Sequence, residues 1–583
     1  MSKETDPKTT TTTARLVANG GDDEDLTGDR QKKRQKITSS SVAAAAANGQ
    51  DIIDDIDVVN INDNYLRPKR LDQLTEWYRT GVKPTPTTAA AADDEVIAAT
   101  TVAAVVDKDI QLITKPFKVM AFNDFIDDDD NNQDFLAELK REINQLDLTS
   151  KNNDLYRLRQ SQDLNNITDG LIGRLCRLFA KQVKPFVQRL TGLELNDNIA
   201  LTVSRYEQND YLLCHDDAIE EDTDGRRVAF ILYLVPDWTA SDGGLLDLFD
   251  SNDRGEPTDI VASVAPKWNR FAFFEVSPVT WHQVSEVVSD SKIRLSVNGW
   301  FHGPRIVRPQ PNLEPQLTTE PATDVPLDVV QSWINPLYLD DSTQWEIRSR
   351  FGDLSEIVLQ DFFAYDKYHE LARALKDSEA IVWRRTGPPN MRRYDSASVN
   401  SCPAIVLEAY ELFRSEAMYL ILSNLTGLKL HELAIAADDD DDDDSEDNNS
   451  SENNESDEDS DHKHNDGIAI TAENSNPRSR GEIRRWSPSY YTLVHDNSAE
   501  LLEKSAALDV IIHFNCDNRE FDRETGGFVS YIGKGVDEEL LTIDPYSNNL
   551  NIVYRDGKTT RFVKYINSKC VDSIYDMSFV YFQ

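Results

Sequence analysis

Two histidines and one aspartate have the residue types and spacing of a mononuclear metal site. His215 and Asp217 are separated by one residue at the end of an apolar segment. Alternate side chains of a β-strand point to the same side, so both are expected to face one interior. His282, on a later segment, is expected to complete the set. Two imidazoles and one carboxylate leave coordination positions open on a metal, which is typical of non-haem iron sites.

A cationic residue follows His282 by twelve positions, on the next apolar run. We expect this residue, Arg294, on a neighbouring strand near the metal. Its planar guanidinium can donate two parallel hydrogen bonds to a carboxylate, which suits a dicarboxylate co-substrate. A structural zinc site would need four Cys or His ligands, and the sequence has no such spacing. Ordinary surface or core histidines remain an equal alternative at this point.

The residues around these positions resemble one known family. The similar words are Tyr211-Leu-Leu-Cys-His215-Asp-Asp217, Ser277-Pro-Val-Thr-Trp-His282-Gln-Val-Ser-Glu-Val287, Arg294-Leu-Ser-Val-Asn-Gly-Trp-Phe-His-Gly303, Lys115-Pro-Phe117, Asn153-Asp-Leu-Tyr156 and Gln160-Ser-Gln-Asp-Leu164. From about residue 115 to the C-terminus, the chain resembles the 2-oxoglutarate- and iron-dependent prolyl hydroxylases that modify the decoding-centre protein of the small ribosomal subunit.

The resemblance implies a site and a reaction. Fe(II) would bind His215, Asp217 and His282. Arg294 would bind the far carboxylate of 2-oxoglutarate, together with the hydroxyl of Tyr206. With dioxygen as co-substrate and ascorbate as reductant, the implied activity is that of a peptidyl-proline dioxygenase, a prolyl 3,4-dihydroxylase that senses oxygen and affects the accuracy of translation termination.

The segments around the site have the pattern of short strands with a few helices. Apolar residues at helical spacing predict amphipathic helices at 135–146 and 171–190. Strands are predicted at 117–125, 200–206, 211–215, 227–235, 245–248, 260–264, 270–275 and 294–301. Many short strands separated by turn signals are typical of a jelly roll, here a double-stranded β-helix with helices on one side.

Several residues near the site are expected to have packing or backbone roles only. Gly243 and Gly244 are expected to give a turn its backbone freedom rather than to make a direct contact. Asn298 and Trp300 are expected to fill the core, and His302 to lie on a loop or edge without binding metal.

Composition divides the chain into an extension, two domains and a linker. Residues 1–105 are predicted to be disordered. Their basic word, Arg30-Gln-Lys-Lys-Arg-Gln-Lys36, is either a nuclear import signal or a solvated charge run. Residues 106–305 are predicted to be the catalytic domain, the Pro-rich segment 306–328 a linker, and residues 329–583 a second domain.

The second domain repeats words of the first in the same order. Arg189-Leu-Thr-Gly-Leu-Glu-Leu195 recurs as Asn424-Leu-Thr-Gly-Leu-Lys-Leu430, Tyr211-Leu-Leu-Cys-His215-Asp as Tyr491-Thr-Leu-Val-His495-Asp, and Gly243-Gly244 as Gly526-Gly527. The second copy has Asn497 where the first has Asp217, and Asp576 near the position of Arg294. We therefore predict an α+β, mainly β chain of two tandem jelly rolls, of which the second is degenerate and non-catalytic.

Charge restricts the partners of the chain. The acidic insert at 437–480 is predicted to be disordered, and it contributes to a formal net charge of -42. This charge argues against direct nucleic-acid binding, and no apolar run is long enough for a membrane span. A basic ribosomal protein of the small subunit is the expected partner, in the nucleus and cytoplasm.

Two other functions stay open. One is an oxygen-responsive regulator that binds a transcription or translation termination factor through its C-terminal domain. The other is a histone or nucleic-acid oxygenase, which a nuclear signal favours and the acidic balance disfavours.

Overall fold

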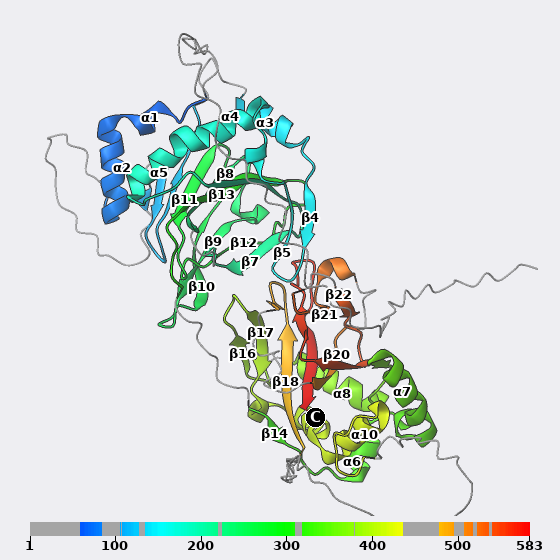
Figure 1. Cartoon of the computed structure of the whole chain (residues 1–583). Coiled ribbons are helices and arrows are strands. Elements are labelled where there is room, and N and C mark those ends of the chain that lie inside the picture. Colours follow the sequence, from blue (N-terminus) through cyan, green and yellow to red (C-terminus); the bar gives the residue numbers. More distant parts are fainter. Residues whose placement is uncertain are drawn as a thin grey trace, which may run out of the picture.

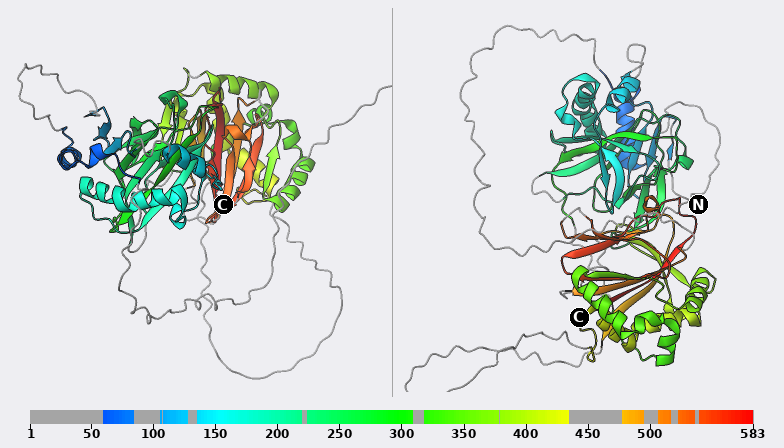
Figure 2. Two further views of the ribbon diagram at one scale, coloured as in Figure 1. Left: turned by 90° about the horizontal axis from the view of Figure 1, so that it is seen from above. Right: turned by 90° about the vertical axis from the view of Figure 1, so that its right-hand side faces the viewer.

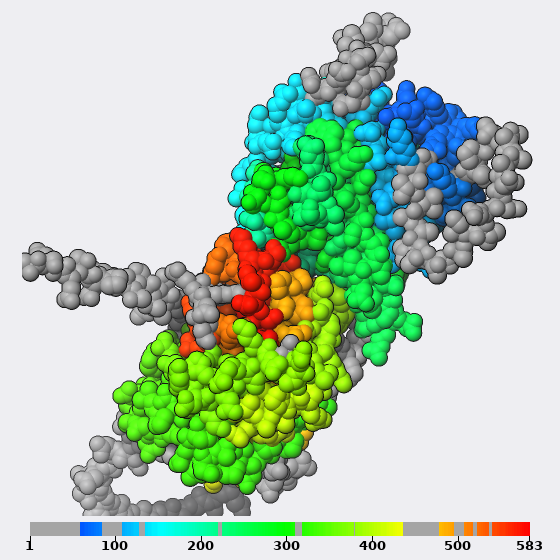
Figure 3. All heavy atoms as spheres, turned by 180° about the vertical axis from the view of Figure 1, so that it is seen from behind, coloured from blue at the N-terminus to red at the C-terminus, as the bar shows by residue number. Residues whose placement is uncertain are grey.

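The chain folds into two units, each built on β-strands with helices on one side (Figure 1). The computed structural model describes residues 59–83, 105–106, 108–127, 135–219, 224–308, 318–377, 379–434, 477–494, 506–516, 522–535 and 539–582. The first unit lies within residues 59–308 and the second within 318–582. Seen from behind in Figure 3, the orange and red segments of the second unit lie directly against the first.

One rolled antiparallel sheet forms the body of the first unit. Its strand order is β1-β2-β3-β11-β8-β13-β6-β5-β7-β12-β9-β10, with β4 paired to β5. The strands are β1 (Val105–Val106), β2 (Ile110–Ile113), β3 (Val119–Phe122), β4 (Thr149–Asn152), β5 (Tyr156–Gln160), β6 (Ile199–Tyr206), β7 (Tyr211–His215), β8 (Gly225–Tyr233), β9 (Leu246–Ser251), β10 (Pro257–Val264), β11 (Arg270–Glu275), β12 (His282–Val284) and β13 (Arg294–Gly303). Side chains from β6, β8 and β13 and from β7, β9 and β12 line one cavity, so the two halves of the roll enclose it. The predicted jelly roll is confirmed.

Helices cover one face of this roll and bury its largest apolar cluster. They are α1 (Asp63–Leu66), α2 (Pro68–Thr80), α3 (Phe135–Ile143), α4 (Gly170–Leu178) and α5 (Lys184–Thr191), with the short turns η1 (Leu164–Asn166), η2 (Phe179–Val183) and η3 (Ala240–Asp242). The helix predicted at 171–190 exists, but the π-turn η2 divides it into α4 and α5.

The prediction of disorder throughout residues 1–105 is wrong for residues 59–83. Leu74, Trp77 and Tyr78 on α2 are buried, and they have the i, i+3, i+4 spacing of one helix face. Tyr78 also donates a hydrogen bond of 2.9 Å to Glu275 of β11. The low-complexity sequence on both sides conceals this short apolar pattern. Residues 1–58 and 84–104 lie outside the described residues.

The second unit repeats the strand plan of the first. The order β23-β20-β25-β18-β17 has the connectivity of β11-β8-β13-β6-β5, and β22-β21-β24 has that of β10-β9-β12. The strands are β14 (Glu320–Pro321), β15 (Glu356–Leu359), β16 (Trp383–Thr386), β17 (Arg392–Ala397), β18 (Arg478–Trp486), β19 (Tyr491–Thr492), β20 (Ala506–Phe514), β21 (Val529–Gly533), β22 (Glu539–Ile543), β23 (Leu550–Asp556), β24 (Thr559–Val563) and β25 (Ile574–Phe582). The duplication predicted from the repeated words is therefore present in the fold.

The helices of the second unit lie on the side away from the first unit (Figure 2). They are α6 (Leu327–Trp333), α7 (Asp341–Leu354), α8 (Tyr365–Lys376), α9 (Ala404–Arg414) and α10 (Glu416–Thr426). The unit also has the short turns η4 (Pro336–Leu339), η5 (Val399–Ser401) and η7 (Arg523–Thr525), and η7 contacts the first unit. Among the described residues, no helix has the length and apolar character needed to cross a membrane.

Two predicted boundaries of the second unit need correction. Glu320 pairs with Ser479 between β14 and β18, so residues 320–328 belong to the second unit rather than to the linker. Strand β18 begins at Arg478, inside the segment predicted as the acidic insert. Residues 435–476, which hold most of that insert, lie outside the described residues.

Candidate active site

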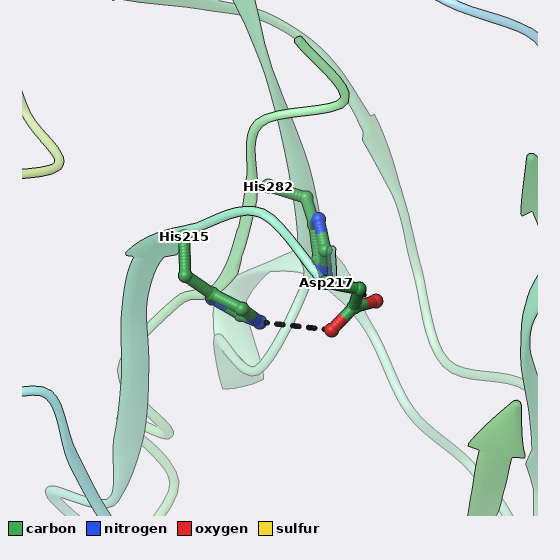
Figure 4. Close-up of side chains that lie close together, drawn as sticks. All are labelled: His215, Asp217 and His282. Atoms are coloured by element: carbon green, nitrogen blue, oxygen red, sulfur yellow. Dashed lines mark ion pairs between the residues drawn. The ribbon is translucent and has the colours of Figure 1, made fainter. Parts of the chain in front are cut away.

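The structure brings His215, Asp217 and His282 together inside the first unit (Figure 4). His215 is the last residue of β7 and pairs directly with His282, the first residue of β12. The Nε2 atom of His282 lies 3.4 Å from Oδ2 of Asp217, and Nε2 of His215 lies 3.7 Å from Oδ1. All three donor atoms lie within 4.8 Å of one another, as one metal ion requires. Asp217 lies two residues beyond the end of β7, and it faces the same cavity as His215, as expected.

Backbone carbonyls orient both imidazoles. Nδ1 of His215 lies 2.7 Å from the carbonyl oxygen of Leu213, and Nδ1 of His282 lies 2.9 Å from that of Thr280. A carbonyl can only accept a hydrogen bond, so each Nδ1 carries the proton and each Nε2 keeps its lone pair. Such contacts fix the tautomer and the ring plane of metal-binding histidines.

The electrostatics favour neutral histidines beside a charged carboxylate. Burial, with a further contribution from His282, lowers the pKa of His215 to about 4. Burial alone would raise the pKa of Asp217, but His282, His215, the indole N–H of Trp300 and the charge of Arg226 together outweigh it and hold that pKa below its usual value. Two neutral imidazoles and one carboxylate form the open donor set that non-haem Fe(II) sites use, so the residues present fit an iron ion.

Arg294, the first residue of β13, is held so that one of its nitrogens faces the cavity. It is 1% exposed, its Nε donates to the carbonyl of Gly244 at 2.7 Å, and its Nη1 donates to Oγ of Ser296 at 3.3 Å. Its Nη2 has no hydrogen-bond partner in the described part of the chain. An unpartnered buried N–H is costly, and a ligand carboxylate would satisfy it. The site therefore fits 2-oxoglutarate as well as iron.

Tyr206 lies beside Arg294, as the sequence predicts. The two residues pair across β6 and β13, and Cζ of Arg294 is 4.9 Å from the centre of the tyrosine ring. Burial raises the pKa of Tyr206 to about 12, so its hydroxyl stays protonated. A hydrogen bond from this hydroxyl to 2-oxoglutarate stays a prediction. The structure adds Tyr233 of β8, whose ring centre lies 5.2 Å from the same guanidinium carbon.

A cavity of about 250 Å³ surrounds the metal-type residues. It is lined by Asn298 and Trp300. Trp300 also packs against a buried apolar cluster, so its predicted packing role is confirmed, but Asn298 lies at the cavity rather than in the core. The buried indole N–H of Trp300 interacts with the carboxylate of Asp217, and the guanidinium of Arg226 lies 3.6 Å from the centre of the indole ring. Side chains alternate along a β-strand with a period of two residues, so Arg294, Asn298 and Trp300 all lie on the cavity side of β13.

The β4–β5 hairpin supplies a wall of the cavity that the sequence analysis did not assign. Its lining side chains are Lys151, Leu155, Tyr156, Leu158 and Gln160. Tyr156 and Gln160 belong to words that resemble the family, and this resemblance could have identified the hairpin as part of the site.

Two minor predictions are also corrected. His302 lies on β13 and is buried, with Nδ1 3.1 Å from Oδ2 of Asp224, so it is neither on a loop nor at an edge. It does not belong to the metal-type group, as expected. Gly244 does make a direct contact, through its carbonyl to Arg294.

The second unit has no equivalent site among its described residues. The register of β24 on β21 matches that of β12 on β9, and it puts Arg561 at the position of His282. The pairing of Trp486 with Ile574 matches that of Tyr206 with Arg294, so Ile574 occupies the arginine position.

Ion pairs fill the interior of this second roll. Asp576 lies two residues beyond Ile574, and both its carboxylate oxygens accept from Arg484, at 2.8 and 2.9 Å. The cavity beside these residues measures about 30 Å³, room for roughly two water molecules. His495 and Asn497 lie outside the described residues.

Comparison with known proteins agrees with this geometry. Residues 201–302 match the model of the 2OG-Fe(II) oxygenase superfamily, and residues 326–582 match that of the oxoglutarate and iron-dependent oxygenase degradation C-terminal domain. The chain is 40% identical to prolyl 3-hydroxylase OGFOD1 of Mus musculus over 81% of this chain and 90% of the relative. It is 41% identical to prolyl 3-hydroxylase OGFOD1 of Xenopus laevis over 81% and 89%. It is 29% identical to prolyl 3,4-dihydroxylase OGFOD1 of Ostreococcus tauri over 49% and 64%. The chain therefore belongs to the prolyl hydroxylase family of 2-oxoglutarate- and iron-dependent oxygenases.

Proposed function

We propose that this dioxygenase acts as a prolyl 3,4-dihydroxylase on a proline of the decoding-centre protein of the small ribosomal subunit and thereby affects the accuracy of translation termination. The observation that carries the proposal is the similarity to prolyl 3-hydroxylases over most of the chain, joined to an intact metal-type site. The family resemblance of the words around His215, His282 and Arg294 supports the ribosomal substrate.

The residues of the cavity have separate tasks in this reaction. His215, Asp217 and His282 would hold the iron, and Arg294 would hold the far carboxylate of 2-oxoglutarate. When bound, these two groups supply the activation of dioxygen, and ascorbate is the proposed reductant. The walls of the cavity would orient the substrate.

Charge supports a basic substrate. The formal net charge of -42 would accelerate the encounter with a ribosomal protein rich in Lys and Arg, and it disfavours contact with the RNA itself. A distribution between nucleus and cytoplasm would give the enzyme access to newly made and assembled ribosomal proteins.

A second candidate is a regulator whose main task is to bind a transcription or translation termination factor through the second unit. The observation that favours it is the match of residues 326–582 to a domain described as a degradation C-terminal domain. Binding of such a factor would then persist in an Asp217→Ala variant that cannot hold iron.

The test uses the full chain with Fe(II), 2-oxoglutarate and ascorbate on proline-containing peptides from the decoding-centre protein. The wild type is expected to release succinate and add one or two oxygen atoms to a single proline, located by fragmentation in the mass spectrometer. Asp217→Ala should do neither, and Asp250→Ala, at an exposed residue of β9, should act as the wild type does. In cells lacking the chain, the same proline should be unmodified. An unchanged ribosomal proline in those cells would reject the substrate, and binding of a termination factor by Asp217→Ala would favour the regulator.

A further inference from the structure

The interface between the two units is formed by equivalent faces of the two rolls. Tyr211 and Leu213 of β7 pack with Tyr491 and Leu493, their counterparts at β19, and with Tyr565. The rings of Tyr211 and Tyr565 are 4.2 Å apart. Because β7 ends in His215, the second unit packs against the outer side of a strand whose end supplies a metal-type ligand.

The second unit also contacts the segment that follows β12, the strand of His282. Glu286 is buried, and its carboxylate accepts hydrogen bonds from Ser568, with its amide N at 3.0 Å and its Oγ at 2.7 Å. Tyr565 Oη donates to the same carboxylate at 3.3 Å. Both strands that supply histidines are therefore braced from the second unit.

A separate contact reaches the β4–β5 hairpin, the cavity wall identified above. Figure 1 shows β4 and β5 extending toward the part of the second unit that holds β21 and β22. Nζ of Lys564 donates to Oδ1 of Asn152 at 2.6 Å and also to the carbonyl of Asn153. The amide of Val494 donates to Oδ2 of Asp154 at 2.9 Å. Three hydrogen bonds from the second unit thus hold the tip of the hairpin.

Lys564 is well placed to fix this tip. Its own backbone is anchored, because its amide donates to Phe528 and its carbonyl accepts from Gly527, each at 2.9 Å. The residue is 7% exposed, and a buried ammonium is costly unless its hydrogen bonds are satisfied. The hydrogen bonds to Asn152 and Asn153 offset this desolvation cost, so they hold the ammonium of Lys564 at the tip of the hairpin.

The hairpin transmits this contact to the cavity. Strand β5 pairs Tyr156 with Leu212 of β7, and the amide of Leu213 donates to the carbonyl of Leu155 at 2.9 Å. A tip held in place therefore sets how Tyr156 and the other wall residues face the metal-type site. A free tip would leave β5 anchored only along the strand.

We propose that the second unit is a positioning element of the active site and that Lys564 is its positioning residue, holding the β4–β5 hairpin as a fixed wall for the peptide substrate. The proposal rests on the proposed function only in taking a peptidyl proline as the substrate. It gives the non-catalytic copy a defined task that acts on peptide binding, leaving the binding of iron and 2-oxoglutarate unchanged.

The test compares full-length wild type with Lys564→Met, which keeps the apolar stem and removes the donors. Hydrogen exchange of the hairpin, residues 149–160, is measured first in the metal-free protein. We expect exchange to be faster by about 10-fold in the variant, since a hydrogen bond from a charged donor contributes at least that factor. Exchange in β13 should stay as in the wild type. This readout needs no substrate, so it stands or fails independently of the proposed function.

Kinetics then separate positioning from general damage. In Lys564→Met the KM for the peptide should rise by about 10-fold, while the KM for 2-oxoglutarate and the succinate released without peptide stay within about 2-fold. The matched control is Glu524→Ala, which removes the exposed partner of Arg157 at the same interface. Arg157 keeps its ion pair with Asp210, so this change should alter neither exchange nor KM. Equal hairpin exchange and equal peptide KM in wild type and Lys564→Met would overturn the proposal, as would a parallel loss of 2-oxoglutarate binding.

A second variant covers the case in which Lys564→Met does not fold. Asn152→Ala removes one acceptor of Lys564 at an exposed residue of the first unit, so folding should not depend on it. It should reproduce the faster exchange at the hairpin tip to a smaller extent, because the carbonyl of Asn153 still accepts. No change in hairpin exchange with Asn152→Ala would also contradict the proposed role of Lys564.

Discussion

Arg294 and Tyr206 are directly paired across β13 and β6, and the guanidinium carbon lies 4.9 Å from the centre of the tyrosine ring. The ring of Tyr233 lies 5.2 Å from the same carbon. With Nε bonded to Gly244, these contacts fix the plane of the guanidinium. The arginine is therefore preorganised for a carboxylate before 2-oxoglutarate binds.

Replacement of Arg294 by lysine should weaken 2-oxoglutarate binding despite the retained charge. A lysine cannot reproduce the planar fork, so at least one charged hydrogen bond is lost. The KM for 2-oxoglutarate is expected to rise by roughly 10- to 100-fold, since such a bond contributes about 1.5–3 kcal/mol. Steady-state kinetics with varied 2-oxoglutarate measure this change, while Fe(II) affinity serves as the control and should stay constant. An unchanged KM would mean that Arg294 does not bind the co-substrate.

Gly244 should prove sensitive to a single added methyl group. A Cβ at this position would lie 2.8 Å from Cδ of Arg294, and the backbone φ of +62° strains any larger residue. Gly244→Ala is therefore expected to raise the KM for 2-oxoglutarate and to cost about 1–2 kcal/mol in stability.

Gly192 offers the matched control for this change. Its φ is +74°, but a Cβ there would meet nothing within 4 Å. Gly192→Ala should thus lower stability by a similar amount and leave the KM unaltered. Equal KM values for the two variants would show that the close approach to Arg294 has no effect on the co-substrate.

The sequence predicted the parts of the fold that depend on local periodicity. Strands β7 and β11 occur with the predicted bounds, and the other predicted strands lie within a few residues of theirs, because short apolar runs between turn residues can be seen directly in a sequence. The repeated words, such as Gly243-Gly244 and Gly526-Gly527, predicted the duplicate roll. All four of these glycines have a positive φ.

The parts that the sequence did not predict depend on contacts between distant segments. All three metal-type residues were predicted from their types and spacing, but the β4–β5 hairpin was not predicted as a cavity wall, because it meets the site only in the folded roll. Helix α2 was missed because burial of Trp77 requires the roll to be in place. Lys564 likewise gains its role only when the second unit meets the hairpin, whose partner residues are some 400 positions earlier in the chain.

Asp217→Asn should abolish metal binding while the fold persists. The substitution keeps the shape of the side chain and removes the single negative charge among the three ligands, which the second copy also lacks at Asn497. Changes to residues that merely contact ligands cost about 10- to 100-fold in affinity, so the loss of a ligand should exceed about 100-fold.

Anaerobic titration calorimetry with Fe(II) measures the affinity, and circular dichroism checks the fold. Asp250→Asn, at an exposed residue of β9, is the control and should bind iron as the wild type does. Retained affinity in Asp217→Asn would mean that the metal uses other ligands.

Lys564 should also make stability depend on pH in the alkaline range. Burial lowers the pKa of Lys564 to about 8, outweighing Asp154 and Glu539, which raise it, while Arg157 lowers it further. Between about pH 8 and the unfolded value near 10.4, the unfolded chain binds more protons than the folded one. The free energy of unfolding contributed by this group therefore rises with pH across that window and is lowest below about pH 8.

The measurement is the urea dependence of unfolding at several values between pH 7.5 and 9.5, for wild type and Lys564→Met. The free energy of unfolding of the wild type should increase with pH relative to that of the variant. Over the full interval from about pH 8 to the unfolded pKa near 10.4, the increase would be about 3 kcal/mol. Comparison with the variant removes the contribution of other groups, among them Tyr211, whose pKa burial also raises. A difference that stays constant with pH would show that Lys564 titrates normally and that its ammonium is not buried at the interface.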